Sequence, residues 1–409
     1  MNYIKLIQKR VNEYRESKHL SDDPLVADLQ KALELDRVLE NLDERILYSK
    51  DESVFEGGIA GPVCFPLTTE EVQAIMKIAE KHDRHVIPRG AGSGLAGGAI
   101  PLGAPIVIAM TKMNNILEVD TDNRIAWVEP GVINLELSDY LKPFGFHYAP
   151  DPSSQQICTL GGNVANNSGG PHCLADGVTD THVLALEVVL PNGEVTIFGG
   201  LDAEPAGLDL RGAFIGSEGT LGITTKIAVR LSPNPDDVQT LLISFPSMRK
   251  AAETVSAIIA DGIVPAAMEA MDQKTIEVIE KHIPSGYPTD AGAVLLVEVE
   301  GLPDGVEIEA LRIGEIAENH DASDIKIAQT SYQRDALWKG RKSAFGASTY
   351  LAPNYYLHDT VVPRSELADV LDKVNALAEE NNLTIMNVFH AGDGNLHPLL
   401  VFDASEEGT

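Results

Sequence analysis

The chain has 409 residues, of which 44% are hydrophobic and 22% charged, and its formal net charge is −30 at pH 7. This length predicts two or three globular domains rather than one core. The negative charge disfavours nucleic acid and anionic membrane as direct partners, although it leaves room for a local positive site that binds an anionic substrate. No stretch approaches the ~20 apolar residues of a transmembrane helix, and the charged N-terminus lacks a signal sequence, so we expect a cytoplasmic protein.

The three cysteines, Cys64, Cys158 and Cys173, form no CxxC pair. An odd and sparse count is typical of a reducing compartment without disulfides. It also excludes a four-cysteine iron–sulfur cluster within this chain. If electrons leave through iron–sulfur centres, another polypeptide must hold them.

The first half of the chain predicts helices that give way to strands. Apolar residues at helical spacing predict two amphipathic helices in residues 1–45, over 4–14 and 26–42. Thr68 and Glu71 form a capping box that predicts a helix through Glu80. Beyond it the pattern predicts a short strand, a Gly-rich loop over 90–98 and further strands; the expected strands are 85–88, 106–110, 116–119 and 125–129.

Residues 150–181 are rich in Gly, Asn, Ser and Pro and contain few charges. A flexible linker can have this composition. Because the stretch lies between regular elements and contains Leu160, Val164 and Ala165, we interpret it as an ordered ligand-binding segment. A hairpin is predicted next, with strands 183–190 and 195–198 joined by an Asn-Gly turn, and then a strand over 223–231.

Pro233-Asn234-Pro235 predicts a boundary. After it strands and helices alternate, which indicates a second α+β domain. The expected strands are 240–245, 266–271, 293–300 and 383–389, and the expected helices are 248–261, 272–282, 307–319, 331–345 and 364–381.

Gly92-Ser-Gly94-Leu-Ala-Gly97 satisfies the pattern GxGxxG. In a nicotinamide-binding Rossmann unit a helix begins in this loop, but here Gly98 and Pro101 oppose a helix and a strand follows. We therefore favour a loop whose backbone N–H groups cradle a phosphate. A Gly-rich turn without a ligand would explain one or two of these glycines, but not five within nine residues.

Two further segments, 159–170 and 216–222, have the same small-residue character. Three separate small-residue loops in one domain suit a long, flat ligand that crosses several elements. FAD fits this description better than ATP or a simple phosphate.

These segments, in this order, resemble the vanillyl-alcohol-oxidase-type FAD-binding family, and within it the glycolate oxidase branch, next to D-lactate and D-2-hydroxyglutarate dehydrogenases. The resemblance covers about residue 48 to the end and rests on residues 88–98, 148–155, 161–170, 216–222 and 389–398. It implies an α+β chain. A helical segment (1–47) would precede a PCMH-type two-subdomain FAD-binding domain (48–235) and a ferredoxin-like, C-terminally incomplete cap or substrate domain (236–409).

The same resemblance implies FAD bound without a covalent link, since the first loop carries no histidine that could attach it. The loop over 88–98 would hold the pyrophosphate. The implied cofactor-binding residues are Pro88, Arg89, Gly90, Ala91, Gly92, Ser93, Gly94, Leu95, Gly98, Pro130, Gly131, Val132, Pro152, Ser153, Ser154, Gly161, Gly162, Asn163, Ala165, Asn166, Gly219, Gly222 and Ile223.

His390 and His397 flank the turn sequence Gly-Asp-Gly-Asn, which allows both imidazoles to point at one place. Imidazole pairs suit zinc, iron or manganese. The alternative is two independently hydrogen-bonded histidines near a turn. Within the family pattern the pair resembles a divalent-metal site that would bind the substrate oxygens, with Asp393 and Asn395 orienting the histidines.

Arg341 matches an arginine that the family uses for the substrate carboxylate, which a guanidinium binds through two parallel hydrogen bonds. The alternative is a solvated basic helix face. We expect Arg341 and Asn395 among the catalytic residues. In the family a later Glu-His-Gly segment supplies a further metal ligand and the base histidine, so this base is expected beyond the chain end and the metal shell is expected to be incomplete.

The resemblance therefore implies an FAD-dependent dehydrogenase or oxidase that acts on CH–OH donors. A small 2-hydroxy acid, glycolate first, would lose a hydride to flavin N5, and the electrons would pass to iron–sulfur partner subunits or a quinone-type acceptor. D-lactate and D-2-hydroxyglutarate are the alternatives, as is an FAD-binding but inactive subunit. Flavoenzymes that reduce cell-wall UDP-sugars share the fold but lack the motif over 390–397. A complex could hold the chain peripherally at the inner membrane.

Overall fold

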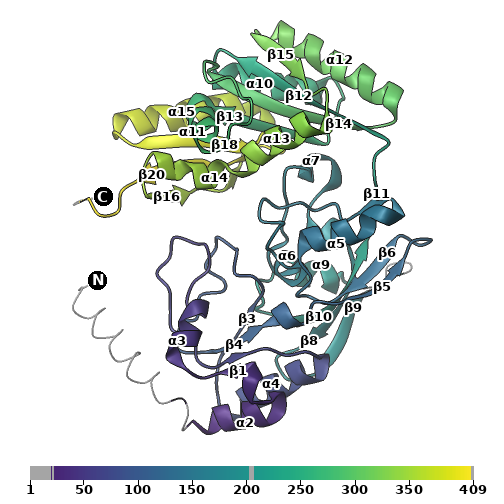
Figure 1. Ribbon diagram of the computed structural model, residues 1–409, viewed down its shortest axis with the longest axis vertical. Coiled ribbons are helices and arrows are strands. Elements are labelled where there is room, and N and C mark those ends of the chain that lie inside the picture. Colours follow the sequence, from purple (N-terminus) through teal and green to yellow (C-terminus); the bar gives the residue numbers. More distant parts are fainter. Residues whose placement is uncertain (1–19, 21–22, 202–206, 407–409) are drawn as a thin grey trace. The chain divides into compact units, whose positions relative to one another are not determined.

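The computed structural model describes residues 20, 23–201 and 207–406. The chain forms two compact units (Figure 1). Unit 1 comprises the residues up to Gly169 together with Val178–Asn234, and unit 2 comprises Gly170–Gly177 and the residues from Pro235 onward. The helix expected over 4–14 lies outside the described residues. Within these residues, no helix is both long and apolar enough to cross a membrane.

A small sheet in unit 1 has the strand order β1-β2-β4-β3, and β4 pairs in parallel with both β2 and β3. Helix α4 (Thr69–Lys81) begins as the capping box predicts, because the Thr68 hydroxyl accepts the N–H of Glu71. Its apolar face lies in the same core as β4. The strands are β1 (Val38–Leu39), β2 (Val63–Cys64), β3 (Val86–Arg89) and β4 (Ile106–Ala109).

A five-stranded antiparallel sheet, in the order β5-β6-β10-β8-β9, makes the second layer of unit 1. Strands β8 and β9 form the predicted hairpin. The strands are β5 (Ile116–Asp120), β6 (Ile125–Val128), β8 (Val183–Val189), β9 (Val195–Gly199) and β10 (Ile223–Arg230), and β7 (Phe146–His147) pairs separately with β11 (Ser232–Pro233). The helices are α5 (Asn134–Leu141), α6 (Leu160–Asn166), α8 (Thr179–His182) and α9 (Leu210–Phe214).

Two predictions in unit 1 are wrong. The helix expected over 26–42 is only α2 (Pro24–Leu33): Glu34 has φ 70°, the strand β1 then pairs with β2, and a separate turn of helix forms α3 (Leu42–Arg45). Sheet pairing therefore overrides the helical periodicity. The segment expected as a loop over 159–170 contains helix α6, whose first turn is capped by the Thr159 hydroxyl.

Unit 2 is built on a nine-stranded sheet whose main path runs β15-β12-β14-β13-β18-β19-β17. Both faces are buried, since alternate residues of β12 and β14 lie in two different cores. Helices α10 and α12 cover one face, and α11, α13 and α14 cover the other (Figure 1). These helices are α10 (Met248–Ala260), α11 (Gln273–His282), α12 (Pro303–Asn319), α13 (Ser331–Lys342) and α14 (Ala344–Ala347), and unit 2 also contains α7 (Cys173–Asp176) and α15 (Leu367–Glu380).

The four long strands of unit 2 lie where they were predicted: β12 (Asp237–Phe245), β13 (Ala267–Asp272), β14 (Ala293–Gly301) and β18 (Thr384–His390). Five shorter ones were not predicted: β15 (Asp324–Ile327), β16 (Asn354–Leu357), β17 (Thr360–Val361), β19 (Asn395–Leu396) and β20 (Pro398–Phe402). The helix expected over 331–345 is also interrupted, since α13 ends at Lys342 and α14 begins at Ala344.

Candidate functional site

The residues expected to bind FAD lie in unit 1, where close packing holds their segments against one another. A Cβ on Gly90 would collide with the Thr159 side chain, and one on Gly219 would collide with the ring of Pro88. A Cβ on Gly161 would lie 2.6 Å from the Cβ of Pro130. These glycines therefore let segments around 88–90, 130, 159–161 and 219 approach each other closely.

Two other glycines of the first loop, Gly94 and Gly98, face open space. A Cβ on Gly94 would meet no atom within 4 Å, and one on Gly98 would meet only the Glu218 carboxylate, at 3.9 Å. Gly92 has φ 77°, a backbone conformation that favours glycine. The loop therefore combines a tightly packed side with an open side, as a cradle for a dinucleotide requires.

A cavity of about 280 Å³ borders this cradle. Four expected cofactor residues line it, together with Arg84 and His85; the four are Pro88, Gly219, Gly222 and Ile223. None of the first-loop glycines lines this cavity, so it lies beside the loop rather than within it.

Two of the expected cofactor residues have structural contacts of their own. Arg89 is buried, lies 5.7 Å from the centre of the Tyr48 ring and donates to the carbonyl of Ala99; burial lowers its pKa. Asn163 is also buried, and its amide is bonded to Asn134 and Cys158. Both side chains therefore support the cradle from within the protein.

Unit 2 contains a buried polar cluster. Strand register places Glu269 of β13 directly opposite His390 of β18, and Glu269 Oε1 lies 2.7 Å from His390 Nδ1. The other carboxylate oxygen, Oε2, lies 2.5 Å from Nη2 of Arg341. The side chains of Glu269 and Arg341 are 0% and 1% exposed, so this ion pair belongs to the interior.

The Glu269–Arg341 ion pair leaves hydrogen-bonding capacity unused. Nη2 of Arg341 faces Glu269 Oε2, whereas Arg341 Nε is buried and has no hydrogen-bond acceptor among the described residues. Burial alone would raise the pKa of Glu269, but the charge of Arg341 and the contact with His390 outweigh it and lower the pKa. We therefore treat Glu269 as a carboxylate.

The imidazoles of His390 and His397 lie together, with ring centroids 5.0 Å apart and planes at 84°. Nε2 of His397 is 3.5 Å from the Asp359 carboxylate, while its Nδ1 is buried and has no hydrogen-bond partner among the described residues. Burial lowers the pKa of His397, and the contact with Asp359 only partly opposes this. The two imidazole rings therefore lie next to each other, but different nitrogens contact a carboxylate: Nδ1 in His390 and Nε2 in His397.

This arrangement does not by itself complete a metal site. Across the described parts of the chain, no three His, Cys, Asp or Glu side chains gather closely enough to hold a metal ion. His390 and His397 offer at most two ligands, and Asn395 and Asp393 accompany them on the same turn. Burial raises the pKa of Asp393.

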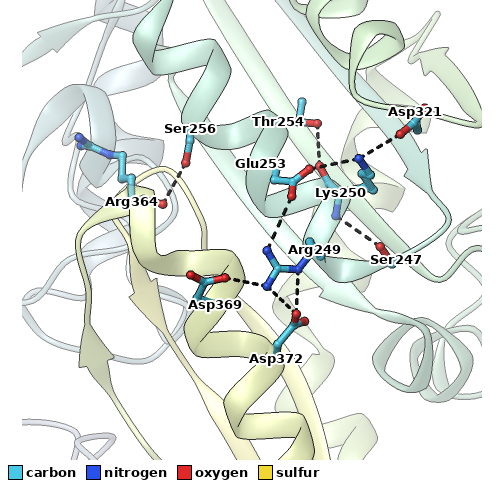
Figure 2. A network of polar contacts seen from close by, with 10 residues as sticks. All are labelled: Ser247, Arg249, Lys250, Glu253, Thr254, Ser256, Asp321, Arg364, Asp369 and Asp372. Atoms are coloured by element: carbon cyan, nitrogen blue, oxygen red, sulfur yellow. Dashed lines mark hydrogen bonds and ion pairs between the residues drawn. The ribbon is translucent and has the colours of Figure 1, made fainter.

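The turn after His390 is anchored from outside the motif. The Arg364 Nε donates to the carbonyl of Gly392. The Arg364 carbonyl accepts from Ser256 of α10, as Figure 2 shows. In the same figure Arg249 of α10 bridges to Asp369 and Asp372 of α15. Arg364 therefore ties the turn to α10, and Arg249 joins α10 to α15; sequence patterns alone did not reveal these contacts.

A second buried carboxylate on the same face of the sheet is Glu298 of β14. It accepts from the Trp338 indole N–H at 2.7 Å and from Thr240 at 2.5 Å, and it lies 3.2 Å from His172 Nε2. Trp338 and Arg341 are three residues apart on α13, so one helix contacts both buried carboxylates. His172 belongs to Gly170–Gly177, the segment that interrupts unit 1 in sequence.

The chain has the fold and the family matches of a flavin-dependent oxidoreductase. Two family models match, the FAD binding domain over residues 61–199 and the C-terminal domain of FAD linked oxidases over 234–409. The chain belongs to the family of FAD-linked oxidases, as its motifs predicted.

Curated relatives extend this result. The chain is 43% identical over 346 residues to glycolate oxidase subunit GlcD of Escherichia coli K12, covering 85% of this chain and 69% of that protein. It is 42% identical to the protein of the same name from Bacillus subtilis, covering 89% and 78%. A D-lactate dehydrogenase of Anaerostipes hadrus is 33% identical, with 88% and 78% covered.

Solved structures confirm the predicted PCMH-type fold. p-Cresol methylhydroxylase matches with a TM-score of 0.74 at 17% identity, covering 97% of this chain and 84% of that one. Alkyldihydroxyacetonephosphate synthase matches with a TM-score of 0.78 at 20% identity, covering 92% and 79%.

Proposed function

We propose that this chain oxidises a small 2-hydroxy acid, with glycolate as the first candidate, to the corresponding 2-oxo acid. The observation that carries the proposal is the 42–43% identity to glycolate oxidase subunits over most of the chain. The D-lactate dehydrogenases among the relatives support the same reaction class and make D-lactate the second candidate.

FAD, when bound, supplies the acceptor for the hydride that leaves C2 of the hydroxy acid. In unit 1, the open side of the loop around Gly94 would receive the pyrophosphate, and backbone N–H groups would bind it. In unit 2, Arg341 is proposed to bind the substrate carboxylate with the N–H groups that Glu269 does not use. Because Arg341 is buried, the carboxylate reaches it only if neighbouring side chains move.

His390 is the group best placed to act on the substrate hydroxyl. Its Nδ1 faces Glu269, which leaves Nε2 available to accept a proton or to bind a ligand. Asn395, directly opposite His390 in the β18–β19 pair, is proposed to orient the substrate or the imidazole.

Anaerobic reduction of the bound flavin tests the proposed reaction. The purified, FAD-loaded chain should lose its visible flavin absorbance when glycolate or D-lactate is added, and acetate, which has the carboxylate but no hydroxyl, should leave the spectrum unchanged. Faster bleaching by glycolate than by D-lactate supports the first candidate. Bleaching by none of the 2-hydroxy acids, D-2-hydroxyglutarate included, contradicts the proposal and favours an FAD-binding but inactive chain.

A divalent metal held by His390 and His397 is a narrower proposal, and no step above depends on it. Two imidazoles are half of a four-coordinate set, so other ligands would be required. Elemental analysis of the purified protein should find close to one zinc, manganese or iron per chain, and His390→Gln should lose it. Absence of metal in the wild-type protein contradicts this proposal.

We also propose that the chain works as one subunit of a larger enzyme, since the relatives from Escherichia coli and Bacillus subtilis are named as subunits. The proposed partners carry iron–sulfur centres and accept the electrons, and the complex is proposed to associate peripherally with the inner membrane. Purification of the tagged chain from its native cells should yield iron and acid-labile sulfide in the same fraction.

A further inference from the structure

The pairing of β13 with β18 fixes how His390 is oriented. Glu269 and His390 are directly opposite in the antiparallel register, so their side chains stand on the same face of the sheet. The carboxylate is 0% exposed, and its two oxygens face two different groups, His390 Nδ1 at 2.7 Å and Arg341 Nη2 at 2.5 Å. A guanidinium only donates hydrogens, so the oxygen that faces Arg341 must act as an acceptor.

The second oxygen acts as an acceptor as well, because a carboxyl group buried at ion-pair distance from a permanently charged guanidinium is paired with it as a carboxylate. We infer that Glu269 is a positioning residue of the oxidation site: its carboxylate holds His390 in the tautomer that carries the proton on Nδ1 and leaves Nε2 free for the substrate or a ligand. Arg341 completes the arrangement by holding the other oxygen. The role of Glu269 in the oxidation rests on the proposed function, whereas the inferred tautomer of His390 does not.

A purely structural ion pair is the competing explanation. Burying a carboxylate and a guanidinium costs desolvation free energy, and apolar residues of similar volume often stabilise a protein as well or better. The nearest neighbours of Glu269 along β13 are apolar: Met268, Ala270 and Met271. A charge placed among such residues, and aimed at an imidazole that faces a second imidazole, is better explained by control of that imidazole.

Glu269→Gln distinguishes the two explanations because the side chain keeps its size, but one of its two equivalent oxygens is replaced by an NH₂ group that only donates. The amide oxygen must turn to the donor-only Arg341, which places the amide NH₂ against His390 Nδ1. That nitrogen must then accept, so the proton of His390 moves to Nε2. The matched control is Glu298→Gln, which alters a buried carboxylate on the neighbouring strand β14 without touching His390.

Long-range ¹H–¹⁵N spectra of protein labelled with ¹⁵N-histidine report the protonated ring nitrogen directly. They are recorded at pH 8, above the ordinary imidazole pKa of about 6.5, on metal-depleted, FAD-loaded protein, and the His390 signals are assigned by their loss in His390→Gln. We expect Nδ1–H in the wild type and in Glu298→Gln, and Nε2–H in Glu269→Gln. A wild-type His390 protonated on Nε2 overturns the inference even if Glu269→Gln does not fold.

Kinetics supply the second readout. With the hydroxy acid that bleaches the wild-type flavin, Glu269→Gln should slow bleaching at saturating substrate by roughly 10–100-fold, with an unchanged flavin spectrum. Glu269→Asp, which keeps the charge, should recover part of the rate. Equal rates for wild type and Glu269→Gln would overturn the positioning role. A wild type that no hydroxy acid bleaches would instead contradict the proposed function and leave the tautomer measurement as the test.

Discussion

The Glu269–Arg341 pair allows a stability prediction that does not depend on the reaction. Arg341→Met leaves a buried carboxylate without its cation and should lower the free energy of unfolding of unit 2 by about 3–5 kcal/mol. The double variant Glu269→Gln/Arg341→Met leaves no unpaired charge and should recover part of this loss. Urea unfolding followed by Trp338 fluorescence, in a Trp127→Phe background, measures the unit 2 transition alone. Equal losses in the single and double variants would show that the two side chains are not coupled.

Two glycines of the first loop should respond differently to the same substitution. Gly90→Ala places a methyl group against Thr159 and should destabilise unit 1 even without cofactor. Gly94→Ala points into open space, so it should leave the stability of the apoprotein unchanged but weaken FAD binding, because the methyl group would occupy the space of the pyrophosphate. Thermal unfolding of apoprotein and FAD titration by fluorescence quenching measure the two effects. Normal FAD affinity in Gly94→Ala would place the cofactor elsewhere.

At the residue scale, sequence patterns identified His390, His397 and Arg341 as candidates but not their partners. Glu269 lies between apolar residues of β13, and only the register of β13 with β18 reveals that it faces an imidazole. The only signal for it in the sequence is that a charged residue occurs in a strand expected to be buried. A buried charge is uncommon without a partner. Asp359 and Arg364 reach the site through folding of distant segments, so no local spacing could reveal them.

At the scale of elements, the Arg37–Glu71 pair joins the stretch after α2 to the first turn of α4. Arg37 donates to both oxygens of Glu71, at 2.5 and 2.7 Å. Burial alone would raise the pKa of Glu71, but Arg37 and the backbone N–H groups outweigh it and lower the pKa. The stabilisation is therefore present above the ordinary glutamate pKa and is lost as the pH falls below it.

Arg37→Gln should consequently destabilise unit 1 at pH 7 by about 1–3 kcal/mol, and the difference from wild type should shrink as the pH falls from 5 to 3. Thermal unfolding across this range measures it. Arg84→Gln, which loses a more exposed contact with Asp23, serves as the control and should show a smaller effect. A difference that stays constant with pH would assign the effect to packing of the Arg37 side chain instead.

His172 and Leu174 connect the segment Gly170–Gly177 to the rest of unit 2. His172 contacts Glu298 and the Trp338 ring, and Leu174 packs against Gly392. His172→Ala should therefore speed amide hydrogen exchange in this segment by about tenfold, the equivalent of one lost hydrogen bond to a charged group. His147→Ala, in unit 1, should not change it. Unaltered exchange in His172→Ala would show that the other contacts of the segment, such as the packing of Leu174, hold it without His172.

Local patterns predicted the long elements of both units and failed where distant strands decide the structure. Helix α4 and the β8–β9 hairpin follow from capping and turn residues close in sequence. In contrast, β17 and β19 have two residues each and exist because they pair with each other, while β19 also pairs with β18. Helix α6 escaped prediction because its glycines and asparagines are poor helix formers, and tertiary packing of Leu160 and Val164 overrides this preference.

At the scale of the whole molecule, each unit has its own cores, and the expected cofactor residues belong to unit 1 alone. A ligand stabilises the part of a protein whose native state binds it, by about 2.7 kcal/mol at a concentration one hundred times Kd. FAD added to the apoprotein should therefore slow hydrogen exchange in buried strands of unit 1, such as β8 and β10, by up to about one hundredfold. Strands β12 and β14 of unit 2 should change little. Equal protection in both units would have one of two meanings: unit 2 supplies cofactor contacts beyond the expected residues, or the two units unfold as one. FAD titration of variants in unit 2 would distinguish these two explanations.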